Sequence, residues 1–171
     1  MDIFNISDTD KFESEALKIF KHQARHNDVY KRFINLLRIE PDKVRQLREI
    51  PFLPVEFFKS QKVLSTTSRV EQIFTSSGTT GTTQSRHYVT DLQIYTKSFT
   101  KGFEYFYGSI KEFTILALLP GYLERQGSSL IYMVDHFIKS SESENSGFYL
   151  NELEALSKLL IQLDSQGEKV L

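Results

Sequence analysis

One apolar segment limits the folds available to this chain more than any other feature. Residues 113–119 read FTILALL, with a single polar side chain, and Pro120 and Gly121 end the run. A strand that is apolar at successive positions, rather than at alternate ones, is covered on both faces. Because that cover comes from helices, the segment predicts the central strand of an α/β sheet.

The sequence around this strand supplies elements of both types. Short β-prone runs occur at residues 62–65, 70–74, 87–90 and 148–150. Apolar residues at helical spacing mark residues 92–106, 128–139 and 153–163. We therefore predict an α/β fold in which residues 51–171 form a mixed sheet flanked by helices.

The amino-terminal region, residues 1–50, is predicted to be helical. Residues 7–10, SDTD, supply capping side chains for a first helix that carries Phe12 and Phe20 on one side, and Asn27 or Asp28 can cap a second. The apolar face of this second helix is predicted to hold Val29, Phe33, Leu36 and Leu37. Residues 50–58 then place two prolines among bulky apolar side chains, which predicts an extended connector packed on the core.

Composition excludes several functional classes. The net charge of −1 gives no basic field for nucleic acid or an anionic membrane, and cysteine is absent. The chain shows no secretion signal and no span-length apolar run, so we expect a soluble, cytoplasmic protein without membrane insertion. His22, His26 and His136 lie on predicted helices and suggest no metal site with protein ligands.

The carboxy-terminal residues, 167–171, look like a turn followed by the start of another strand. We therefore expect that the α/β region is truncated at this end and that a longer polypeptide has been cut. A sheet without its later strands exposes an apolar edge or face, which favours self-association as a homo-oligomer.

The loop at residues 75–83 carries the strongest functional signal. It holds two glycines and, over residues 76–83, six hydroxyl side chains, between two β-prone runs. Glycine allows close approach of the backbone, and converging N–H and O–H donors suit a phosphate group. A flexible surface linker has the same composition, but a linker has no reason to join two strands inside a domain. The loop also lacks the lysine of a Walker A motif.

The same residues resemble a known phosphate loop. Residues 76–81, SSGTTG, are similar to the loop of the adenylate-forming superfamily of acyl-CoA synthetases, peptide-synthetase adenylation domains and luciferases. Residues 50–60, IPFLPVEFFKS, together with Ser85 and Arg86 after the loop, resemble the LuxE-type acyl-protein synthetases and the phenylacetate-CoA ligases. The resemblance implies a partial adenylate-forming-enzyme N-terminal domain.

It also implies a two-step reaction for the parent protein. A carboxylic (fatty) acid would be activated by ATP as an acyl-adenylate and then transferred to a thiol acceptor, which could be coenzyme A, a carrier protein or a reductase subunit. The cofactors implied are ATP and Mg²⁺, because the carboxylate and the triphosphate are both anions whose charge must be neutralised. The later magnesium, ribose and lysine motifs of the superfamily have no counterpart before Leu171. We therefore expect the 171-residue chain to be inactive alone, with its catalytic residues unknown.

We assign the ATP phosphates to the following residues: Thr75, Ser76, Ser77, Gly78, Thr79, Thr80, Gly81 and Arg86. Many members of the superfamily carry Pro-Lys after the loop, where this chain has Thr83 and Gln84. Arg86 is either the replacement for that lysine or an ordinary surface arginine. His87, its neighbour on the strand, could approach the nucleotide, but strand alternation sends it to the opposite face, which favours a structural or exposed residue.

A second segment, residues 119–129, follows the apolar strand and precedes a helix. Open α/β sheets place ligands at such a point. The family resemblance implies that this region borders the acyl and nucleotide pockets, which makes Arg125 and Ser128 candidates. For Ser128 a plain helix cap is the favoured interpretation. Two other functions stay open for the chain as a whole: a non-catalytic nucleotide- or phosphate-binding module, and an interaction domain whose loop binds nothing.

Overall fold

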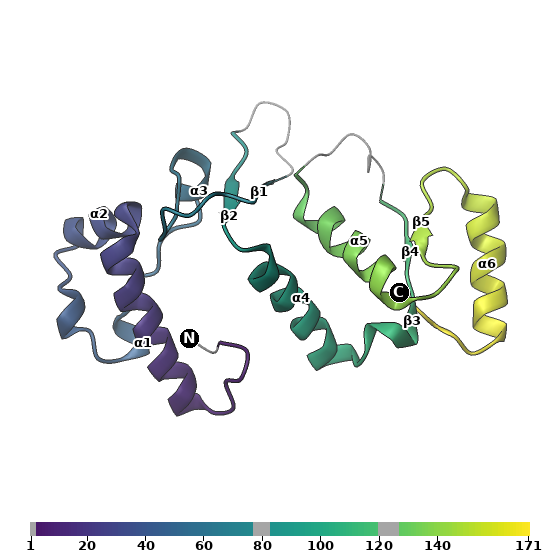
Figure 1. Ribbon diagram of the computed structural model, residues 1–171, viewed down its shortest axis with the longest axis horizontal. Helices are drawn as coiled ribbons and strands as arrows, with labels where there is room; N and C mark the ends of the chain where they lie inside the picture. Colours follow the sequence, from purple (N-terminus) through teal and green to yellow (C-terminus); the bar gives the residue numbers. More distant parts are fainter. Residues whose placement is uncertain (1–2, 77–82, 120–126) are drawn as a thin grey trace. The chain divides into compact units, whose positions relative to one another are not determined.

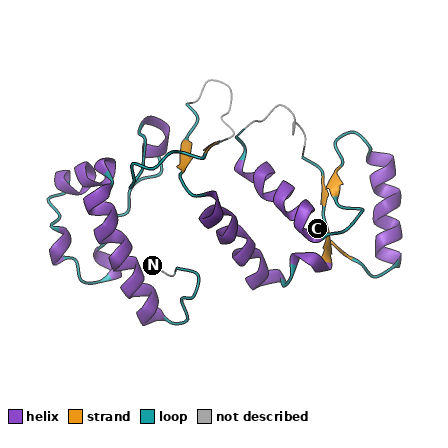
Figure 2. Cartoon of the chain, in the orientation of Figure 1, coloured by secondary structure: helices purple, strands orange, loops and turns teal. Residues whose placement is uncertain are grey.

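The computed structural model describes residues 3–76, 83–119 and 127–171, which form two compact units, Met1–Leu92 and Gln93–Leu171. Figure 1 shows the order of their elements, and Figure 2 shows that helices predominate. The fold is a mixed α/β fold with small two-stranded sheets. One mixed sheet was predicted; instead, the antiparallel and parallel pairs of the described residues fall in different units. The division into residues 1–50 and 51–171 stays a prediction.

Two helices build the core of the first unit. α1 (Thr9–His26) and α2 (Asp28–Leu36) are capped by the side chains of Asp8 and Asn27, as predicted. Phe20, Tyr30 and Ile34 are buried between them, and two 3-10 turns, η1 (Pro41–Lys43) and η2 (Leu47–Glu49), follow. This core is local in sequence, so it can form from the first 50 residues and the connector that follows them.

The predicted apolar face of α2 is wrong at its carboxyl end, where Leu36 is 84% exposed. Arg38 adopts a left-handed backbone with φ of 57°, and the Ile39 N–H donates to the Ile34 carbonyl at 3.0 Å. This is a Schellman turn, which reverses the chain directly after the helix. Ile39 therefore packs against the core, and Leu36 and Leu37 are left at the surface.

The proline-containing connector packs on this core, as predicted. The Tyr30 hydroxyl donates to the Pro51 carbonyl at 2.7 Å, and burial raises the pKa of Tyr30 to about 12. The aromatic ring of Phe57 lies 5.8 Å from that of Phe33. One helical turn, α3 (Phe57–Ser60), ends the connector, and residues 62–65 are not a strand, contrary to the prediction. The connector thus carries the chain from the helices to the hairpin.

Two strands follow as an antiparallel hairpin. β1 (Gln72–Thr75) pairs with β2 (Arg86–Val89), with Thr75 opposite Arg86 at the end nearest the loop. The glycine and hydroxyl loop therefore joins two strands, as predicted. At the other end, the Glu71 carboxylate accepts a hydrogen bond from the Leu92 N–H at 2.8 Å, which anchors the first turn of α4 (Leu92–Tyr107) to the hairpin base.

The second unit is built on the predicted central strand. η3 (Ile110–Glu112) leads into β3 (Phe113–Thr114) and β4 (Leu116–Ala117). β3 pairs in parallel with β6 (Lys169–Val170), and β4 with β5 (Gly147–Phe148). The Leu116 N–H donates to the Leu171 carbonyl, whereas the Ile115 carbonyl accepts from the Gly147 N–H. Successive residues thus bond to strands on opposite sides. Residues 113–117 therefore act as one strand between two others.

Helices cover both faces of this small sheet. α5 (Ser129–Ser141) connects β4 to β5, and α6 (Leu153–Ser165) connects β5 to β6. Figure 1 shows α4 and α5 on one side of the strands and α6 on the other. The first crossover runs from the central strand to β5, and the second returns from β5 past the central strand to β6. Because such connections are right-handed, two crossovers in opposite directions place their helices on opposite faces of the sheet. Phe103, Ile115 and Phe137 meet on the α4 and α5 side.

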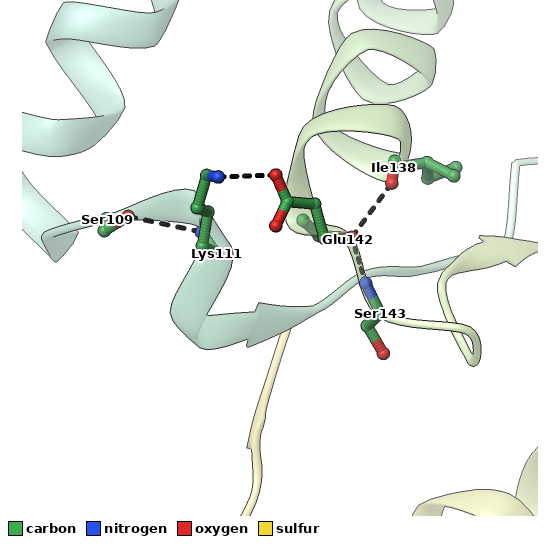
Figure 3. Close-up of polar contacts among 6 residues, drawn as sticks. Ser109, Lys111, Ile138, Glu142 and Ser143 are labelled. Carbon is green, nitrogen blue, oxygen red and sulfur yellow. Dashed lines mark hydrogen bonds and ion pairs between the residues drawn. The ribbon is translucent and has the colours of Figure 1, made fainter.

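The carboxyl end of α5 is tied to the start of the central strand. Glu142 has a left-handed backbone with φ of 59° and pairs with the Lys111 ammonium of η3 (Figure 3). Ser141 donates to the Ile138 carbonyl at 2.9 Å and to the Ser146 hydroxyl at 2.7 Å. These bonds hold the polar loop after α5 against the edge of the strand.

Candidate functional site

The hairpin presents two chemically different faces. Side chains directly opposite each other on antiparallel strands share a face, and neighbours along a strand alternate. Phe74 and His87 therefore lie on one face, together with Val89, and Phe74 and Val89 are buried. Thr75 and Arg86 lie on the other face, where Arg86 is exposed. On the first face His87 is exposed as well, whereas the second face carries Thr75 and Arg86 directly beside the loop.

The buried face rests on α3. The rings of His87 and Phe58 meet edge to face with centroids 6.2 Å apart, and burial lowers the pKa of His87. A neutral imidazole against an aromatic ring has a packing role. The structure therefore agrees with the structural interpretation of His87, and it explains how residues 57–60 support the hairpin.

Two hydrogen bonds join Ser76 and Ser85, the residues that follow β1 and precede β2. The Ser76 N–H donates to the Ser85 carbonyl at 3.2 Å, and the Ser85 N–H donates to the Ser76 hydroxyl oxygen at 3.0 Å. Both bonds lie beyond the last strand pair, so the ordered hairpin extends to the point where the loop begins. The Ser76 oxygen accepts here, which leaves its own hydrogen for donation to a ligand.

The predicted phosphate-binding residues divide into two groups. Thr75, Ser76 and Arg86 are brought together at the end of the hairpin. The others lie outside the described residues: Ser77, Gly78, Thr79, Thr80 and Gly81. The structure thus places the two ends of the loop side by side, and the phosphate assignments themselves stay predictions.

The exposed face carries a second cation that the sequence reasoning missed. The Lys62 ammonium lies 5.5 Å from the centre of the Tyr88 ring, a cation–π distance. Tyr88 is two residues from Arg86 and so shares its face. Nothing in the spacing of residues 62 and 88 indicates this contact, because it depends on how the connector passes over the hairpin.

Of the second predicted segment, only the helix start can be placed. The Ser128 hydroxyl accepts from the Ile131 N–H and caps α5, as the favoured interpretation of Ser128 required. Arg125 lies outside the described residues. Ser128 is therefore a structural residue, and the ligand-binding interpretation of Arg125 stays a prediction.

An apolar cavity of about 520 Å³ lies beside the central strand in the second unit. Its lining comes from α4, α5 and residues 115–119, and within the described residues it includes no charged side chain. Gly102 of α4 is part of this lining, and a Cβ atom built there would meet nothing within 4 Å. A glycine inside a helix costs stability, and a larger side chain at this exposed position would meet no other atoms at its Cβ.

Within residues 3–76, 83–119 and 127–171, no three acidic or imidazole side chains gather in a way that could hold a metal ion. None of the helices described there has the length and apolar character needed to cross a membrane.

Comparison with known proteins identifies the family. A sequence model of the LuxE acyl-protein synthetases matches residues 3–126, which include α1, α2, the connector and the hairpin. A long-chain-fatty-acid–luciferin-component ligase of Photorhabdus luminescens is 32% identical over 67 residues, 39% of this chain. The match spans 57% of that relative's length. No solved structure matches significantly. Because the family match covers most of the sequence, the chain belongs to the LuxE acyl-protein synthetase family.

Proposed function

We propose that this chain binds the phosphates of ATP in a ligase that activates a carboxylic acid and passes the acyl group to a thiol. The proposal is supported by membership of the LuxE family and by the hairpin, whose exposed end joins Thr75, Ser76 and Arg86. The acid is proposed to be a fatty acid, as in the name of the Photorhabdus luminescens relative.

The chemistry explains why a loop of donors is needed. A carboxylate oxygen attacks the α-phosphorus of ATP, the bond to the bridging oxygen breaks, and pyrophosphate leaves. The thiol sulfur then attacks the acyl carbon, and AMP leaves with the electrons of the broken bond. Both steps bring anions together, so donors held in fixed positions around the phosphates lower the barrier. Arg86 supplies a positive charge, and Ser76 supplies a hydroxyl.

The magnesium ion implied by the family has no protein-held site in the described residues. Glu71, the acidic residue at the hairpin base, already caps the first turn of α4. Mg²⁺ commonly keeps several waters and binds through substrate phosphates with few carboxylates. We therefore assign no step to the ion and restrict the role of this chain to holding the nucleotide.

Replacing Arg86 tests the charge at the hairpin end. Arg86→Met is expected to weaken the binding of magnesium-ATP about tenfold, because a hydrogen bond to a charged group contributes roughly 1.5–3 kcal/mol and exposure reduces this. Arg69→Met, also exposed and in the same unit, is the control and should leave the affinity unchanged. Calorimetric titration measures both. Equal affinities of the two variants would make Arg86 an ordinary surface residue.

The cavity beside Gly102 is proposed to take the alkyl chain of the acid. Its volume of about 520 Å³ falls within the range of small-molecule pockets, roughly 300–1,000 Å³, and its lining is aliphatic and aromatic. An uncharged lining does not suit the carboxylate itself, which must lie outside this cavity. The wall residues include Phe99, Phe103 and Met133.

Filling the space at Gly102 tests this subsite. Gly102→Leu is expected to weaken binding of tetradecanoic acid at least about tenfold, since several methylenes worth roughly 0.8 kcal/mol each lose their place. Hexanoic acid should be affected much less. Gly102→Ala, which adds one methyl group and favours the helix, is the matched control. Ligand-observed NMR provides the affinities. A uniform loss for all chain lengths would point to general damage to the fold.

A further inference from the structure

A second cavity, which is polar and has a volume of about 700 Å³, lies in the first unit. One wall is the carboxyl end of α1 with the start of α2, and the other is residues 62–67. The lining contains His22, His26 and Lys62 together with the hydroxyl residues Ser65, Thr66 and Thr67. It therefore gathers groups that donate hydrogen bonds or carry positive charge.

The two histidines are held in one arrangement. They stand four residues apart on α1, and their rings are stacked with centroids 4.3 Å apart. His26 Nδ1 lies 2.9 Å from the His22 carbonyl oxygen. A carbonyl can only accept, so Nδ1 of His26 carries the hydrogen and Nε2 is the nitrogen that gains a proton. On protonation, Nε2 becomes a further donor.

Lys62 is fixed beside them without a carboxylate partner. Over residues 3–76, 83–119 and 127–171 the ammonium forms no ion pair, and it lies over the Tyr88 ring instead. The titratable side chains of the described cavity lining are His22, His26, Asp28 and Lys62. Arg25, also in the last turn of α1, is paired with Asp42. With both imidazoles protonated, three positive charges face one carboxylate.

We propose that this cavity is a second anion site, which takes a phosphate-bearing ligand through His22 and His26 and shares Lys62 with the exposed face of the hairpin. Phosphate offers several acceptor oxygens and up to two negative charges, which matches two imidazolium donors, an ammonium and neighbouring hydroxyls. A protonated imidazole donates from both ring nitrogens, so phosphate binding is expected to strengthen as the pH is lowered. The Asp28 carboxylate in the same lining opposes an anionic ligand.

The chain contains four histidines, and this allows a direct test by ¹H NMR. His22 and His26 report on the cavity, His87 on the hairpin and His136 on α5. Each imidazole is titrated with pH, with and without inorganic phosphate. Saturating phosphate should move the titration midpoints of His22 and His26 upward by about one pH unit, which equals about tenfold tighter binding to the protonated form. His87 and His136 should not move.

Variants complete the test. Lys62→Met is expected to weaken phosphate binding at pH 6 about tenfold, and Lys43→Met, which alters an exposed lysine elsewhere in the unit, should not weaken it. Movement of His87 in place of His22 would assign the anion to the hairpin and overturn the proposal. Absence of any phosphate-dependent change would overturn it too. So would zinc binding that is lost in His26→Gln and kept in Lys62→Met, since it would mark a metal site.

Discussion

Removing three hydroxyls from the loop is expected to weaken magnesium-ATP binding about a hundredfold. The variant is Ser77→Ala, Thr79→Ala and Thr80→Ala, which keeps both glycines of the loop. A hydrogen bond to a charged oxygen contributes roughly 1.5–3 kcal/mol, and losses at neighbouring donors are not additive, so we expect a total of about 3 kcal/mol. That free energy corresponds to about two orders of magnitude in the dissociation constant.

The thermal stability of this variant should stay unchanged. The register of the hairpin rests on four residue pairs from Gln72 with Val89 to Thr75 with Arg86, and on the bonds between Ser76 and Ser85. None of these is altered. Ser157→Ala, which alters an exposed side chain of α6, serves as a control for hydroxyl removal. Unchanged ATP affinity in the triple variant would remove the basis of the proposed function, whereas a lowered melting temperature would show that the loop also supports the fold.

The proposed function also predicts what the chain does not do alone. In the proposed function, nucleotide binding needs the hairpin. Adenylation also needs the later magnesium, ribose and lysine motifs of the superfamily, which have no counterpart before Leu171. Binding without pyrophosphate exchange would therefore be consistent with the division of roles proposed for this chain. A non-catalytic binding module gives the same result here and differs only when the whole parent protein is assayed.

Local signals in the sequence predicted the elements that depend on local physics. Asp8, Asn27 and Ser128 stand at helix starts and accept from backbone N–H groups there, which is why the helix starts could be read directly. The apolar run at residues 113–119 predicted a central strand because each face is covered by a different helix layer. The hairpin followed from two β-prone runs around a glycine-containing loop.

Features that depend on the path of the chain were missed. The exposure of Leu36 follows from a left-handed residue, Arg38, at a position that usually belongs to glycine. The separation of antiparallel and parallel pairs into two units leaves no trace in hydrophobic spacing. Lys62 meets Tyr88, and His22 and His26 face residues 62–67, only because the connector turns back on the helices. Helical spacing alone made these histidines look like unrelated surface residues.

The core of the first unit provides the other large expected effect, on the free energy of unfolding. Ile34 is 1% exposed and packs among Phe20, Tyr30 and Val44. Ile34→Ala removes three carbons from a closely packed site, and such truncations cost roughly 2–5 kcal/mol. Because isolated units of this size have only about 5–15 kcal/mol of stability, this change should unfold a substantial part of the population on mild heating.

Leu36→Ala is the matched control, since it truncates a side chain of equal size on the same helix two residues away. Its side chain is exposed, so the free energy of unfolding should change by less than about 0.5 kcal/mol. Urea unfolding followed by circular dichroism distinguishes the two variants. The comparison tests the turn at Arg38 directly: if the helix continued past Leu36 with its predicted apolar face inward, both variants would lose comparable stability. A large loss for Ile34→Ala alone would mean that Ile39 closes this core.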